Sequence, residues 1–126
     1  MQILLDTHAL LWWLADDPRL PSAAAAVIAD TGNQVIVSAA SAWEIAIKKA
    51  VGRLDVPDDL PDVLDASGFD GLPITMSHAL AAGSLPRHHD DPFDRMLIAQ
   101  SHTERLILIT VDRRFSRYDV DLLSLD

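Results

Sequence analysis

The chain has 126 residues, of which 49% are hydrophobic and 23% are charged, and it carries a formal net charge of −9 with no cysteine. This length and composition predict a single globular domain spanning residues 1–126 and exclude a disordered chain. The absence of cysteine excludes disulfides and thiolate metal sites, so carboxylates and histidines are the remaining candidate ligands. The negative charge argues against broad, non-specific nucleic-acid binding, unless the acidic groups gather around bound cations.

Strand-length apolar runs alternate with helical patterns along the whole chain. Strands are expected at residues 3–5, 35–37, 72–75, 106–111 and 120–123, and most are rich in Ile, Leu and Val without polar alternation. Helices are expected at residues 8–15, 22–30, 42–51, 60–66, 77–82 and 92–104. This alternation predicts a doubly wound α/β sheet. The apolar runs are too short to span a bilayer, and the start of the sequence lacks the basic region of a signal peptide, so a cytoplasmic location is expected.

Four acidic residues occupy positions that such a fold brings to one edge of its sheet. Asp6 and Asp112 each follow a strand-like apolar run, while Glu44 and Asp94 stand near the starts of two predicted helices. Ligands of open parallel sheets bind outside the carboxyl ends of the strands, so the four acids are expected to converge there. Carboxylates that cluster in a crevice need cations between them, and oxygen ligands suit Mg²⁺ or Mn²⁺. The pattern therefore predicts metal-dependent hydrolysis of phosphodiesters.

Each of these acids also has a purely structural interpretation. Ser41 with Glu44, and Asp91 with Asp94, match the spacing of a helix capping box, and Asp6 and Asp112 suit turns at strand ends. For any one acid alone the structural interpretation is favoured, and their joint placement shifts the balance towards a site. Glu44 stands among apolar residues and needs a cap role, a cation or a basic partner, and Lys48 four residues later is a candidate partner.

Two other classes of protein compete with the nuclease interpretation. An aspartate-based phosphotransfer protein would use Asp6 as a nucleophile, but the second Asp expected two residues later in a dehalogenase-like enzyme is replaced by His8. A non-catalytic partner-binding module would use the acids only as helix caps. Binding of metal by the acids would separate this module from an enzyme.

Four segments together resemble the PIN-domain ribonucleases, and especially the VapC toxins. They are Leu-Leu-Asp6-Thr7-His8, Ser41-Ala-Trp-Glu44-Ile, Asp91-Pro-Phe-Asp94-Arg95 and Thr110-Val-Asp112. The resemblance covers nearly the whole chain and implies a PIN-like three-layer α/β fold, with a central, mostly parallel sheet of about five strands flanked by helices. It also implies a Mg²⁺- or Mn²⁺-dependent endoribonuclease, the toxin of a type II toxin-antitoxin pair. A non-toxin PIN nuclease that processes RNA has the same motifs and remains an alternative.

The resemblance also assigns roles to particular residues and partners. Asp6, Glu44 and Asp94 carry over as the core metal-binding carboxylates, and Asp112 matches the fourth acid, which supports a second metal or its waters. Thr7 and Thr110 are candidates for supporting these ligands. From their positions, Arg95 and Arg113 are candidates for contacting a site carboxylate or RNA, but a solvated helix arginine is an equally good interpretation of Arg95. The expected partners are RNA, a cognate antitoxin and a second copy of the chain.

The residues beside the carboxylates have less specific interpretations. Asp91 is expected to be the N-cap of the helix that opens at Pro92. His88 and His89 lie in a polar loop and could approach RNA or donate protons, but exposed loop residues are the favoured interpretation, because the expected chemistry needs no histidine. Arg113, Arg114 and Arg117 form either an RNA-contacting patch or a solvated basic patch.

Overall fold

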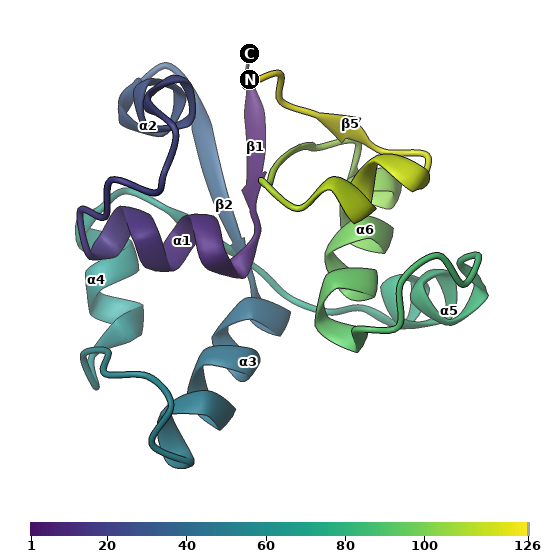
Figure 1. Ribbon diagram of the computed structural model, residues 1–126, viewed down its shortest axis with the longest axis horizontal. Helices are drawn as coiled ribbons and strands as arrows, with labels where there is room; N and C mark the ends of the chain where they lie inside the picture. Colours follow the sequence, from purple (N-terminus) through teal and green to yellow (C-terminus); the bar gives the residue numbers. More distant parts are fainter. Residues whose placement is uncertain (126) are drawn as a thin grey trace.

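A five-stranded sheet forms the centre of the computed structural model, which describes residues 1–125 (Figure 1). Its strands are β1 (Gln2–Leu5), β2 (Gln34–Ser38), β3 (Asp70–Leu72), β4 (Ile107–Ile109) and β5 (Asp121–Leu122). The helices are α1 (Thr7–Leu14), α2 (Ser22–Ala29), α3 (Ala39–Ala50), α4 (Leu60–Ala66), α5 (Met76–Ser84) and α6 (Pro92–Glu104), and a 3-10 helix, η1, covers Arg113–Arg117. None of the helices within residues 1–125 combines the length and the apolar character needed to cross a membrane.

The strand order places a topological switch at β1. The order is β3-β2-β1-β4-β5, and each neighbouring pair is parallel. The chain first builds outward from β1 through β2 to β3, and it then returns to the other side of β1 for β4 and β5. This confirms the predicted α/β sheet. In such sheets ligands bind in the crevice beyond the carboxyl ends of the strands that flank the switch, here β1 and β4.

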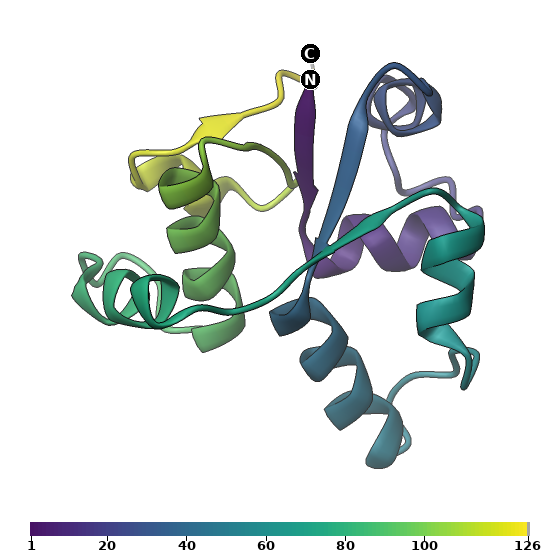
Figure 2. The same cartoon turned by 180° about the vertical axis from the view of Figure 1, so that it is seen from behind.

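Both faces of the sheet are covered, which explains the apolar runs without alternation. Ile3 and Leu5 of β1 pack in one core with residues of α1 and α2, whereas Leu4 packs in a second core with Leu97 and Ile98 of α6. Figures 1 and 2, which view the molecule from opposite sides, show α1, α2 and α4 in one half and α5 and α6 in the other. Because successive side chains of a strand point to opposite faces, a central strand buried on both faces must be apolar throughout.

The third strand lies earlier in the chain than the sequence predicted. β3 covers Asp70–Leu72, where it pairs with β2, and residues 73–75 lead into α5 instead of forming the strand expected at 72–75. β3 is an edge strand, so its backbone pairs with β2 although its side chains are mostly exposed. Pro73 then has no N–H to continue the ladder. The hydrophobic pattern therefore did not predict the position of this edge strand.

The third helix begins three residues before its predicted start at Ala42. Its N-cap is Ser38, whose hydroxyl accepts a hydrogen bond from the Ala40 backbone N–H, and the helix begins at Ala39. Ser41 is thus inside the helix, and the capping box expected between Ser41 and Glu44 is absent. This correction removes the helix-cap interpretation of Glu44, because its carboxylate lies beyond the first turn.

Candidate functional site

Asp6 links the carboxyl end of β1 to the start of α1. It is buried, and its carboxylate oxygen Oδ1 accepts a hydrogen bond of 2.7 Å from the Ala9 backbone N–H, so it is the N-cap of α1. Burial raises the pKa of this carboxyl, and the Thr110 hydroxyl and the Ala9 N–H oppose that rise only in part. The negative charge of Asp112 raises it further. Asp6 therefore caps a helix and also lies at the carboxyl end of β1, where the sequence predicted a site.

Asp94 lies in the first turn of α6, three residues after its N-cap. The Asp91 side chain caps the helix as predicted, by accepting hydrogen bonds from the backbone N–H groups of Phe93 and Asp94. The Asp94 carboxylate is therefore free of the capping role, and its Oδ2 lies 2.7 Å from Nε2 of His89. Burial raises the pKa of Asp94 to about 6, and the charges of Asp91 and Glu44 contribute to the rise.

Asp112 lies beyond the carboxyl end of β4, where it caps η1. Its carboxylate forms a two-pronged ion pair with the Arg114 guanidinium, with the shortest distance of 2.7 Å between Nη2 and Oδ2. This pair lowers the pKa of Asp112 and keeps the carboxyl ionised. The Thr110 hydroxyl accepts a hydrogen bond of 3.0 Å from the Asp112 backbone N–H, which fixes the turn between β4 and η1.

Glu44 faces the same region from α3. Its side chain is only 8% exposed, and its Oε2 accepts a hydrogen bond of 2.8 Å from Lys48 Nζ, the partner that the sequence indicated. Its other oxygen, Oε1, is buried and has no hydrogen-bond partner among residues 1–125. A buried, ionisable oxygen without a partner is costly, so this atom marks a place where a donor or cation is missing.

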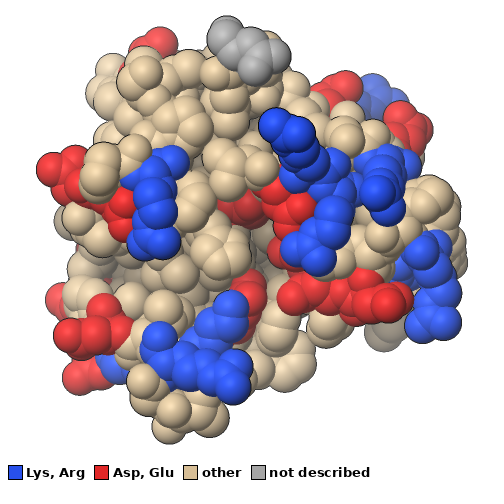
Figure 3. Space-filling model, in the orientation of Figure 1, with Lys and Arg blue, Asp and Glu red and all other residues tan. Residues whose placement is uncertain are grey.

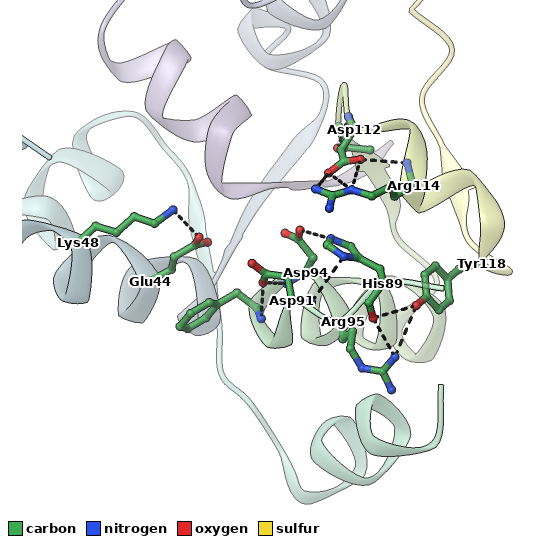
Figure 4. Close-up of polar contacts among 11 residues, drawn as sticks. Glu44, Lys48, His89, Asp91, Asp94, Arg95, Asp112, Arg114 and Tyr118 are labelled. Atoms are coloured by element: carbon green, nitrogen blue, oxygen red, sulfur yellow. Dashed lines mark hydrogen bonds and ion pairs between the residues drawn. The ribbon is translucent and has the colours of Figure 1, made fainter. Parts of the chain in front are cut away.

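These four acids lie on separate segments near the carboxyl edge of the sheet, and the structure brings some of them closer together than others. Figure 4 shows Asp94 between Glu44, which projects from α3, and Asp112, which precedes η1. Potential ligand atoms of His89, Asp94 and Asp112 lie within 4.8 Å of one another. Among residues 1–125 this group does not include Glu44 or Asp6, although the charge of Glu44 raises the pKa of Asp94 and the charge of Asp112 raises the pKa of Asp6.

The donor set fits a hard divalent cation. It is dominated by carboxylate oxygens, which Mg²⁺ and Mn²⁺ prefer, and it includes one buried oxygen without a partner. The raised pKa values of Asp6 and Asp94 show that the protein itself compensates the charge of these two acids incompletely. A bound cation would reverse this imbalance, because it favours the ionised form of every carboxylate around it.

The residues expected to support the acids, Thr7, Arg95 and Arg113, have different surroundings in the structure. Thr7 donates a 3.0 Å hydrogen bond from its hydroxyl to that of Ser41, which joins the start of α1 to α3. Arg113 is exposed in η1, and its neighbour Arg114 is the residue that pairs with Asp112. The expectation that Arg95 pairs with a site carboxylate or contacts phosphate is corrected, because its guanidinium donates to backbone carbonyl oxygens. These carbonyl oxygens belong to Ala82, Leu85, Pro86 and His89.

His89 is the site residue that sequence reasoning missed. It was interpreted as an exposed loop residue, but its side chain is only 5% exposed and it bonds to Asp94. The spacing of five residues between them gave no periodic signal, because the loop before α6 must turn back for the two side chains to meet. The adjacent His88 is exposed, as expected.

Basic side chains flank the acidic centre although the chain as a whole is acidic. Figure 3 shows Lys and Arg on two sides of a central hollow whose walls carry Asp and Glu. Figure 4 places Lys48 and Arg114 on these opposite sides. A separate cavity of about 520 Å³ lies near the far end of α6, with Ser101, His102 and Asp119 in its lining, and is not part of this centre.

Comparison with known proteins identifies the family. Residues 3–121 match the PIN domain, which covers almost the entire chain. The chain therefore belongs to the PIN-domain family. Within the family it is a homologue of VapC ribonucleases: it is 32% identical to Ribonuclease VapC22 of Mycobacterium tuberculosis over 115 residues, which cover 89% of this chain and 88% of that protein. It is also 37% identical to Ribonuclease VapC16 of the same organism over 69 residues, or 48% of this chain and 49% of that protein.

Solved structures confirm the three-layer fold. VapBC2 from Rickettsia felis, bound to a DNA fragment from its promoter, aligns with a TM-score of 0.72 and 16% identity over 98% of both chains. A toxin-antitoxin complex from Klebsiella pneumoniae aligns with a TM-score of 0.68 and 20% identity, again over 98% of both chains. The PIN-like α/β architecture predicted from the sequence is thus confirmed.

Proposed function

We propose that this chain is an endoribonuclease that hydrolyses RNA phosphodiesters with Mg²⁺ or Mn²⁺ held by Asp6, Glu44, Asp94 and Asp112. One observation carries the proposal: ligand atoms of Asp94 and Asp112 lie within 4.8 Å of each other near the topological switch, and the buried Oε1 of Glu44 has no partner among residues 1–125. Helix caps alone do not require this arrangement. Homology to the VapC ribonucleases supports the RNA-cleaving part of the proposal.

Each part of the centre has a distinct task in this reaction. The acids would hold the ion, which when bound would activate water and stabilise charge on the phosphate. The N-cap of α1 fixes the rotamer of Asp6, and the turn held by Thr110 fixes the backbone of Asp112. Lys48 and Arg114 stand where they can contact the RNA backbone on either side of the acids. For Arg114 this requires release of its ion pair with Asp112.

The test is cleavage of total cellular RNA by the purified protein with Mg²⁺, Mn²⁺ or EDTA. We expect discrete, metal-dependent fragments, and a loss of at least about 100-fold for Asp6→Asn and Asp94→Asn. Asp6→Asn keeps an oxygen for the α1 cap, so its fold should be preserved. Asp90→Asn changes an exposed acid in the loop before α6 and is the matched control. Equal cleavage by all variants, or cleavage unaffected by EDTA, would contradict the assigned centre.

We further propose that the chain acts in the cytoplasm as the toxin of a type II pair and that a cognate antitoxin neutralises it. Support comes from the structural neighbours, several of which are toxin-antitoxin complexes. The acidic centre suits a basic segment, such as an arginine side chain of the partner. Cleavage should stop when the protein encoded beside this chain is added. If the antitoxin binds Asp94→Asn as tightly as it binds the unmodified protein, it contacts the chain away from the acids.

A homodimer is the remaining part of the proposal. Large apolar side chains are exposed on α3, at its C-cap and on α5, and are available to a second copy. They are Trp43, Ile47, Val51, Met76 and Leu80. Light scattering coupled to size-exclusion chromatography should give twice the chain mass of 13.8 kDa. A monomeric mass at micromolar concentration would refute this part alone.

A further inference from the structure

His89 is held against Asp94 from outside the group of four acids. Its Nε2 lies 2.7 Å from Asp94 Oδ2, and its side chain is almost completely buried (Figure 4). The residue belongs to the loop between α5 and α6, so neither a strand nor the α6 helix itself determines where its ring lies. Another set of contacts must therefore fix it.

The loop carrying His89 is anchored from two other elements. The His89 carbonyl oxygen accepts hydrogen bonds from Arg95 Nη1 at 3.3 Å and from the Tyr118 hydroxyl at 3.4 Å. The same guanidinium and hydroxyl also bond to the Pro86 carbonyl oxygen, at 3.0 and 2.9 Å. The His89 ring packs near Phe115, with ring centroids 6.3 Å apart. Contacts from α6, η1 and the residue after it thus fix both the backbone and the ring.

The surroundings of the ring decide which nitrogen carries the proton. Nδ1 lies 3.5 Å from the Asp91 backbone nitrogen, which can only donate, so Nδ1 is the acceptor and Nε2 carries hydrogen in the neutral ring. Nε2–H then donates to Asp94 Oδ2. A histidine that ligates a metal instead directs its other ring N–H at an acceptor, which this ring lacks. The geometry favours an orienting hydrogen bond over direct ligation, although His89 lies within ligand distance of Asp94 and Asp112.

We propose that His89 is a positioning residue for the metal centre. Its Nε2–H holds Oδ2 of Asp94 and leaves Oδ1 to bind the metal in a fixed orientation. This inference rests on the proposed function, because it assumes that Asp94 is a ligand. Hydrogen-bond partners of metal ligands contribute about 10-fold to 100-fold to metal affinity, which is the size of effect expected here.

The experiment measures Mn²⁺ affinity without RNA, by electron paramagnetic resonance of free Mn²⁺, together with the thermal midpoint of the metal-free protein. His89→Gln places an amide N–H where Nε2 was, whereas His89→Asn and His89→Ala do not reach Asp94. We expect His89→Ala and His89→Asn to weaken Mn²⁺ binding at least about 10-fold, and His89→Gln to restore most of it. His88→Ala removes the neighbouring exposed histidine and should leave the affinity unchanged. The comparison of Gln with Asn keeps the test valid if the Ala variant fails to fold.

Several outcomes would overturn the inference. Unchanged Mn²⁺ affinity in His89→Asn would show that the hydrogen bond does not position Asp94. Nitrogen modulation from a directly bound imidazole, seen by electron spin-echo spectroscopy of the Mn²⁺ complex and lost in His89→Gln, would make His89 a ligand. If the unmodified protein binds no Mn²⁺ and cleaves no RNA, the proposed function fails. If the unmodified protein does both, and the His89 variants bind Mn²⁺ as tightly as it does, the positioning role alone fails.

Discussion

The two helices that bring carboxylates to the site from outside the sheet hold them in different ways. On the α6 side, defined by His89, Asp94 and Arg95, the acid bonds to a buried ring whose loop is anchored by a guanidinium. On the α3 side, defined by Ser41, Glu44 and Lys48, one carboxylate oxygen bonds to a partly exposed lysine and the other has no partner among residues 1–125. The α6 side is therefore organised before any ligand arrives, whereas the α3 side is left incomplete.

This difference assigns separate tasks to the two sides. Holding a ligand in one orientation reduces the reorganisation needed when a cation or phosphate binds. An oxygen buried without a partner instead stores an unfavourable interaction that binding relieves. The α6 side would thus set geometry, and the α3 side would add affinity. The variants below test the sides separately, beginning with the largest expected change in stability.

Loss of the Arg95 anchor should have the largest effect. Arg95→Ala removes the donor for four backbone carbonyl oxygens, of Ala82, Leu85, Pro86 and His89. Hydrogen bonds to a charged group are worth more than neutral ones, but some of these carbonyls retain access to water, so we expect a loss of about 4 kcal/mol in unfolding free energy. Urea denaturation measures it. Arg87→Ala, which removes a largely exposed arginine from the same loop, should change it by less than about 0.5 kcal/mol.

Asp94→Asn should make the metal-free protein more stable at neutral pH. Burial raises the pKa of Asp94 from 3.8 to about 6, so the folded state binds this proton more tightly than the unfolded state does. Its contribution to stability is therefore greatest below pH 3.8 and is lost as the pH rises through about 6. The shift corresponds to about 3 kcal/mol at pH 7.5, which the neutral amide would recover.

The measurement is the unfolding free energy in EDTA between pH 5 and 7.5. The gain from Asp94→Asn should shrink as the pH falls, while Asp90→Asn, at an exposed position, should show no such trend. A loss of stability for Asp94→Asn at pH 7.5 would mean that the α6 side compensates the charge fully. That result would sharpen the contrast with the α3 side, where one carboxylate oxygen has no partner among residues 1–125.

The parts of this structure that the sequence predicted are those determined by short-range patterns. The strand-end positions of Asp6 and Asp112 and the cap at Asp91 follow from apolar runs and helix-start chemistry, and the structure has them. β3 was misplaced because an edge strand needs backbone partners more than apolar side chains. The start of α3 was misplaced because both Ser38 and Ser41 suit an N-cap.

The contacts of the α6 side could not have been predicted in the same way. The anchoring of His89 depends on Tyr118, which lies 29 residues away, and on an arginine whose charge suggested a carboxylate or phosphate partner. Nothing local distinguishes His89 from the exposed His88. The acids could be proposed as a site from sequence because each stands at a predicted strand end or near a predicted helix start, whereas the contact of His89 with Asp94 depends on how a loop folds back.

Ser41→Ala tests the support of the α3 side. The hydroxyl of Ser41 accepts the 3.0 Å hydrogen bond from Thr7, which joins α3 to the turn that carries Asp6. Both groups are buried, so we expect a loss of about 1 kcal/mol in unfolding free energy. Combining Ser41→Ala with Thr7→Val should cost less than the sum of the two single changes, because one hydrogen bond is lost only once. Strict additivity would show that the hydroxyls do not interact, and Ser67→Ala, at an exposed serine, is the control.

Lys48→Met should have the smallest effect on stability and the clearest effect on metal binding. The lysine is partly exposed and one helical turn from Glu44, so its removal should cost about 0.5 kcal/mol in EDTA. Its ammonium group also competes with a cation for the Glu44 carboxylate. Removing it should therefore tighten Mg²⁺ binding, measured by calorimetry, by a few-fold while RNA binding weakens. Lys49→Met, which breaks only a surface pair with Asp58, should leave Mg²⁺ affinity unchanged. Weaker Mg²⁺ binding in Lys48→Met would show that the lysine positions Glu44 as His89 is proposed to position Asp94, and the two sides of the site would then work alike.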